Sequence, residues 1–143
     1  MKIKFVLVAF LFLTLNFTLS MAIPNGYQIS FQSKESKSKR VYLGNFYGKF
    51  NQYVDSVILD SNGNGLFKAA TKLSPGIYFL QDHRKIQLLD FIVANDDQQI
   101  TIEEINYETA SYKVQGGNEN LLYSAYNEFV RKAVPEINQY RAE

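Results

Sequence analysis

The sequence predicts a mainly β fold: an antiparallel β-sandwich or open barrel of about eight short strands, followed by a C-terminal α-helix. Aromatic residues make up 15% of the 143-residue chain, with 10 Tyr and 11 Phe, and these side chains favour pleated, half-buried strands. Between residues 23 and 117, short apolar runs alternate with polar turns. From Asn118 onward the apolar residues recur every three or four positions, which is the period of a helix.

The expected strands follow one another at close spacing. Residues 27–32 alternate strictly between apolar and polar side chains, as a strand with one buried face does. The run 86–94 is the most apolar after residue 23, so we expect it to be a central strand. Turn residues separate the runs, and the eight expected strands are 27–32, 41–47, 53–60, 66–71, 77–80, 86–94, 99–103 and 111–115.

The segment 118–143 is expected to be a helix, or a linker toward a further domain downstream. Asn118 can cap its start by accepting a backbone N–H, and Pro135 should kink or restart it because proline lacks that donor. A helix of this length needs a packing partner, and its apolar residues are too widely spread to be buried on one face. The expected apolar stripe consists of Leu122, Tyr126, Phe129, Ala133, Ile137 and Tyr140.

Residues 1–22 have the layout of a secretory signal peptide. Lys2 and Lys4 precede the apolar run 5–15, and Ser20-Met21-Ala22 supplies small residues before a cut after Ala22. The apolar run is about half the roughly 20 residues that span a bilayer, so we expect cleavage rather than an anchor. The segment 23–117 would then be an exported β-rich domain, located in the periplasm or at the cell surface.

The composition excludes several kinds of chemistry. The chain contains no cysteine, which rules out a thiolate nucleophile, disulfide exchange and thiolate metal sites within it. Its formal net charge is +1, so there is no electrostatic reason to expect nucleic acid or an anionic membrane as a partner.

The stretch "DSNGNG" at residues 60–65 matches the opening of an EF-hand calcium loop. The twelfth loop position, which needs a bidentate glutamate, is Thr71, and the ninth is Lys68. The flanking sequences are strand-like, whereas an EF-hand needs helices. We therefore interpret "DSNGNG" as a hairpin turn, since Asn and Gly tolerate the positive φ angles of tight turns.

Other candidate groups lack partners in the sequence. His83 is the only histidine, and no motif supplies it with a nucleophile or carboxylate. Glu103 and Glu104 should point to opposite faces of a strand, and the pair at 96–97 should form a turn. The tyrosines favour sheet packing over a stacking platform. No catalytic residue, metal ligand or cofactor site is expected.

The order of several short motifs resembles a known family. The motifs are Asp55-Ser56, "NGNGLF", Pro75-Gly76-Ile77-Tyr78, "LLDFIV", "DQQITI" and "VQGGNEN". Together they are similar to the β-rich N-terminal domain of unknown function that precedes thioredoxin-like domains in exported proteins of Bacteroidota. Its motif residues, expected here to be structural, are Asp55, Ser56, Gly65, Phe67, Pro75, Gly76, Tyr78, Gly116 and Asn120.

The resemblance implies a non-catalytic role. The full-length relatives resemble TlpA/ResA-type thiol–disulfide reductases and AhpC/TSA-type peroxiredoxins, whose cysteines lie in the downstream domain. This chain would be a truncated or stand-alone accessory domain that positions, dimerises or recruits partners for a thioredoxin-like protein, with possible self-association through its helix. The alternative is a ligand-binding module that holds a glycan or peptide with exposed Tyr and Phe; coplanar exposed rings would favour it.

Overall fold

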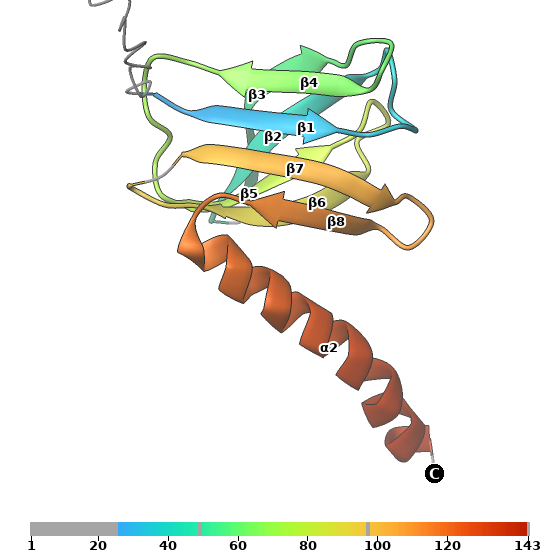
Figure 1. Cartoon of the computed structure of the whole chain (residues 1–143). Helices are drawn as coiled ribbons and strands as arrows, with labels where there is room; N and C mark the ends of the chain where they lie inside the picture. Colours follow the sequence, from blue (N-terminus) through green and yellow to red (C-terminus); the bar gives the residue numbers. More distant parts are fainter. Residues whose placement is uncertain (1–25, 49, 97, 143) are drawn as a thin grey trace, which may run out of the picture.

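The computed structural model describes residues 26–48, 50–96 and 98–142, without the side chains at 135, 136 and 140–142. The expected signal peptide at 1–22 lies outside the described residues. Eight strands precede one long helix in this part of the chain (Figure 1). The elements are β1 (Gln28–Gln32), β2 (Arg40–Tyr47), β3 (Phe50–Ile58), β4 (Asn64–Lys68), β5 (Gly76–Gln81), β6 (Gln87–Val93), β7 (Gln99–Asn106), β8 (Ser111–Gln115) and α2 (Asn118–Ala142).

The strands form two four-stranded sheets, in the orders β4-β1-β7-β8 and β3-β2-β5-β6. The mainly β prediction is confirmed, and the two facing sheets identify a sandwich rather than a barrel (Figure 1). One pair departs from the antiparallel expectation: β1 runs parallel to β7, with Gln28 opposite Gln99. These two strands are far apart in the sequence, so the intervening hairpins provide the long connection that parallel pairing requires.

Alternating side chains of both sheets form the core. Ile29 and Phe31 of β1 face Val41 and Leu43 of β2 across it, and all four are almost fully buried. The apolar residues at every second position, which predicted β1 and β7, are therefore the residues that face the core. The remaining buried members of the core cluster are Tyr27, Leu59, Phe67, Tyr78, Leu80, Phe91, Val93, Ile100 and Ile102.

The prediction that 86–94 forms a central strand was wrong, because β6 lies at the edge of its sheet. The apolar composition of β6 is explained by the contacts that this strand makes. Phe91 and Val93 belong to the core, while the outer edge of β6 meets the beginning of α2 through Asn120. Asn120 thus protects this edge at Ile92.

The β2–β3 hairpin is longer than expected. The sequence placed a turn at 48–52, but β3 already begins at Phe50 and pairs there with Tyr47. Gly48, with φ of 61°, occupies the turn. The register shifts between Leu43 and Gly44, leaving one extra residue in β3, which is a β-bulge.

The helix α2 leaves the sandwich at the end of β8 and projects away from it (Figure 1). It is continuous from Asn118 to Ala142, so the expectation that Pro135 restarts the helix was wrong. The proline removes one donor, but a projecting helix leaves the freed carbonyl accessible to water. Among the described residues, no helix is both long and apolar enough to cross a bilayer.

Candidate functional site

The motif residues Gly116 and Asn120 fix the start of α2 against both sheets. Gly116 has φ of 101°, and a Cβ there would lie 2.1 Å from the carbonyl oxygen of Gln99. Asn120 is 2% exposed. Its Nδ2 donates to the carbonyls of Ile92 (2.8 Å) and Gly116 (2.9 Å), and its Oδ1 accepts from the N–H of Ile92 (2.8 Å). The side-chain amide thus pairs with the β6 edge as a neighbouring strand would.

Asp55 and Ser56 are neighbours on β3, and Asp55 contacts Tyr27, which directly precedes β1 of the other sheet. The hydroxyl of Tyr27 donates to Asp55 Oδ2 (2.8 Å), and the N–H of Ser56 donates to Asp55 Oδ1 (2.7 Å). Burial and the adjacent carboxylate raise the pKa of Tyr27. Arg40 Nη1 donates to Ser56 Oγ (3.0 Å). The motif therefore joins two strands of one sheet and connects them to the segment that enters β1.

The remaining motif residues serve packing. A Cβ at Gly65 would lie 2.4 Å from Leu59 Cδ2, so this position must be small. Phe67 is buried in the core. Pro75 and Gly76 lead into β5, and the hydroxyl of Tyr78 donates back to the carbonyl of Ser74 (2.8 Å). The motif residues lie on separate elements and build the scaffold rather than one reactive centre.

The stretch "DSNGNG" is a turn between β3 and β4. Asp60 Oδ1 accepts the N–H groups of Asn62 and Asn64, each at 2.8 Å, and Gly63 has φ of 85°. Backbone hydrogen bonds, chiefly that from Asn64, lower the pKa of Asp60. The carboxylate thus closes its own turn, as predicted. The turn is not a hairpin turn, however, because β3 and β4 belong to different sheets.

The candidate chemical groups do not converge. His83 is exposed on the β5–β6 turn, and the exposed Glu103 and partly buried Glu104 lie on opposite faces of β7. Ser33 Oγ donates to Glu104 Oε2 (2.9 Å). Asp96 is exposed, and residue 97 lies outside the described residues. In the described part of the chain, no three His, Asp or Glu side chains are grouped as metal ligands.

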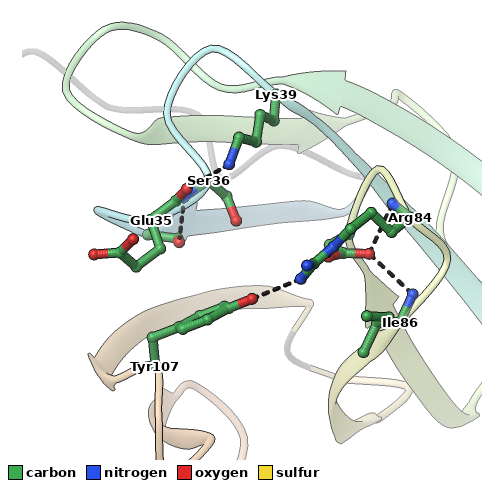
Figure 2. Close-up of polar contacts among 8 residues, drawn as sticks. Glu35, Ser36, Lys39, Arg84, Ile86 and Tyr107 are labelled. Atoms are coloured by element: carbon green, nitrogen blue, oxygen red, sulfur yellow. Dashed lines mark hydrogen bonds and ion pairs between the residues drawn. The ribbon is translucent and has the colours of Figure 1, made fainter.

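A polar cluster that sequence reasoning missed ties the loops at one end of the sandwich (Figure 2). Asp82 directly precedes the exposed His83 but is itself only 2% exposed. Its carboxylate accepts the N–H of Ile86 (2.9 Å) and the Nε of Arg84 (2.8 Å). Burial alone would raise the pKa of Asp82, but these bonds and the N–H of Arg84 lower it. Arg84 Nη2 also donates to the hydroxyl of Tyr107 (2.6 Å), linking the two sheets.

Gln98 is a second buried polar residue that sequence reasoning missed. Its Nε2 donates to the carbonyls of Leu73 and Ala94, both at 2.9 Å, and its Oε1 accepts the N–H of Leu73 (2.8 Å). It holds the segment before β5 against the turn after β6. A polar residue directly before an alternating strand gives no sign of burial, so only its contacts reveal the role.

Aromatic rings cover the outer face of the β3-β2-β5-β6 sheet. Phe79 packs against Phe46 (4.9 Å between centroids, 51° between planes) and Tyr53 (6.3 Å, 76°). Lys85 Nζ lies 3.1 Å from the centroid of Tyr42 and 4.0 Å from that of Tyr53, which is cation–π geometry. The rings are tilted against one another and partly covered, so they do not form the coplanar row expected of a stacking platform.

The apolar stripe of α2 lies on the side opposite the sandwich. At 100° per residue, Leu122, Tyr126 and Phe129 point away from the direction of Asn120, which contacts β6. They are 72%, 61% and 69% exposed. The expectation of exposed apolar surface is confirmed for these side chains, and Ile137 is also exposed. The side chain of Tyr140 lies outside the described residues.

These features define a two-sheet β-sandwich domain with a projecting, partly apolar helix. The family described as "Domain of unknown function (DUF4369)" matches residues 27–123. The chain belongs to this family, which spans the sandwich and the first turns of α2.

Comparison with solved structures adds a structural likeness. No curated protein matches the chain. The crystal structure of (S)-allantoin synthase is similar to it with a TM-score of 0.44 and 12% sequence identity, over 64% of this chain and 43% of that chain. This chain thus spans less than half of the enzyme's length, and the likeness carries no argument about activity.

Proposed function

We propose that this chain is an exported, non-catalytic accessory domain that uses α2 to bind a protein partner. The partner class is a thioredoxin-like thiol–disulfide oxidoreductase, which the domain would position, dimerise or recruit. The resemblance described above supplies the partner class, and the exposed stripe of α2 supplies the contact surface.

The observation that carries this proposal is the exposure of Leu122, Tyr126 and Phe129 on one face of a projecting helix. Fully burying one such side chain contributes about 1.5–3 kcal/mol. A helix gains most of its stability from packing of an apolar face, and the described sandwich does not cover this one.

The family resemblance and the absence of cysteine support a non-catalytic role. Reduction of a disulfide or a peroxide by this class of protein needs a thiolate. The purified chain should therefore neither reduce insulin nor reduce peroxide. Activity that persists through purification to homogeneity would contradict the proposed role.

The test compares two substitutions that each add one carboxylate to α2. Phe129→Glu changes the stripe, whereas Asn127→Glu changes the side that faces the sandwich. Light scattering would measure self-association, and calorimetry would measure binding to an exported thioredoxin-like oxidoreductase of the same organism. We expect association or binding by the wild type and by Asn127→Glu, and its loss in Phe129→Glu. A wild-type protein that stays monomeric and does not bind the oxidoreductase would contradict the proposal.

A further inference from the structure

A groove of about 480 Å³ lies between β6, β8 and the inner side of α2. Leu88 and Asp90 of β6, Tyr112 and Val114 of β8, and Ala125 and Arg131 of α2 are among its lining residues. The volume is within the range of about 300–1,000 Å³ that is usual for ligand sites. This groove is distinct from the exposed stripe, which lies on the other side of α2.

The wall of the groove at β6 is an open strand edge. β6 pairs with β5 on one side only, and Asn120 occupies both the N–H and the C=O of Ile92 on the other side. In an antiparallel ladder, backbone groups two residues apart point in the same direction. The N–H and C=O of Asp90 therefore also point away from β5, toward the edge that borders the groove.

The open edge is short because both of its ends are closed. Asn120 takes the place of a strand residue opposite Ile92. At the other end, the β5–β6 register shifts between Leu80 and Gln81, so that Gln81 pairs with Gln87 and Leu88 is the extra residue. A bulge of this kind interrupts strand pairing. The edge between them can accept only a few residues of an added strand, at about 3.3 Å per residue.

The floor of the groove is apolar. Leu88, Leu89, Tyr112 and Val114 are partly buried and pack against the core. Burial raises the pKa of Asp90, whose carboxylate accepts hydrogen bonds from Gln87 and Tyr123. An apolar floor beside free main-chain groups suits an extended peptide, whose alternate side chains point down while its backbone pairs with the edge.

We propose that this groove binds a short extended peptide segment by strand addition to β6 at Asp90. A second copy of β6 would need a longer open edge than Asn120 and the bulge leave. A sugar could reach the backbone groups of Asp90 through its hydroxyls, but it lacks the regularly spaced N–H and C=O groups that a strand presents. The proposal concerns a different face from the stripe of α2 and does not depend on the partner proposed for that stripe.

The experiment uses the full chain and the peptide acetyl-Val-Thr-Val-Thr-Val-amide, with the same peptide N-methylated at every residue as its control. Two-dimensional NMR would record backbone amide shifts up to millimolar peptide. We expect the shifts to centre on Asp90, and the exchange of its amide hydrogen to slow about tenfold, as for one added hydrogen bond. The N-methylated peptide should have no effect, because none of its five residues has a backbone N–H to donate.

Two pairs of variants distinguish strand addition from nonspecific binding. Asp90→Pro removes the N–H at an edge position that tolerates proline and should abolish binding, while Asp90→Ala keeps the N–H and should bind. If Asp90→Pro does not fold, Ala125→Trp fills the groove from α2, and Ala133→Trp on the far side of the helix is its control. Absence of shifts with wild type, equal shifts with the N-methylated peptide, or binding that survives Ala125→Trp would each overturn the proposal.

Discussion

The side-chain amide of Asn120 hydrogen-bonds both backbone groups of Ile92, with each donor–acceptor distance at 2.8 Å. This pairing makes a helix residue part of a sheet edge. It fixes where α2 begins, on which side its apolar stripe lies, and where the open edge of β6 ends. One buried side chain thus determines the start of α2, the orientation of its apolar stripe and the end of the open β6 edge.

Asn120→Ala should lower the free energy of unfolding by about 1–3 kcal/mol, because it leaves buried backbone groups without partners. Urea unfolding would measure the loss. Asn120→Asp retains the acceptor for the N–H of Ile92 but loses both donations, so it should also destabilise. Hydrogen exchange at the Ile92 amide should become faster in Asn120→Ala, which removes its acceptor, than in Asn120→Asp, which keeps it. A change below about 0.5 kcal/mol, typical of surface substitutions, would contradict the structural role.

Gly116→Ala should destabilise the fold more than Gly48→Ala. Both glycines have positive φ, at 101° and 61°, so both substitutions should incur the backbone cost of about 1–2 kcal/mol. A Cβ at 116 would also meet the carbonyl of Gln99 at 2.1 Å, whereas one at 48 has no neighbour within 4 Å among the described residues. Chemical denaturation of the two variants would measure the difference, and equal losses would disprove the steric argument.

Asp82→Asn should make stability less dependent on pH. The pKa of Asp82 is lowered in the folded protein, so its carboxylate stabilises the fold above the unfolded pKa of about 4, and this contribution is lost as the pH falls through the folded value. Urea unfolding between pH 7 and pH 2.5 would measure it. The wild type should be the more stable at pH 7, and the gap should narrow below about pH 4. A gap that stays constant with pH would rule out the carboxylate as its source.

We predict that residues 1–22 are a signal peptide that is cleaved after Ala22, because Ser20 and Ala22 lie three residues and one residue before that bond and follow the apolar run 5–15. Mass spectrometry of the exported protein should find Ile23 at the N-terminus. Replacing Ala22 with a bulky residue such as Phe should block or move the cut, whereas replacing Ile23 with Val should not. A mature protein that retains Met1 would disprove the assignment.

Local patterns in the sequence determined most of the strands and the start of the helix. The strict alternation in 27–32 identified β1, and the change of period at Asn118 identified α2. Asn and Gly residues identified the turn at 60–65, because they tolerate conformations that other side chains avoid, and Gly63 adopts one of them, with φ of 85°. The motif containing Gly116 and Asn120 marked a junction, although only the contacts with Gln99 and Ile92 explain it.

The tertiary structure alone decided which strands are neighbours and which polar residues are buried. The run 86–94 became an edge strand because strand order is set by long-range pairing, which leaves no periodic signal along the chain. Gln98 is buried because the distant backbone of Leu73 satisfies it, and a sequence does not record such a partner. Asp82 is instead satisfied within its own turn by the N–H groups of Arg84 and Ile86, and Arg84 links that turn to Tyr107 of the other sheet. The direction of α2 likewise follows from Asn120 joining Ile92, 28 residues away. Local conformational preferences act within a few residues, whereas the groove and the exposed stripe depend on contacts that form only when the sheets assemble.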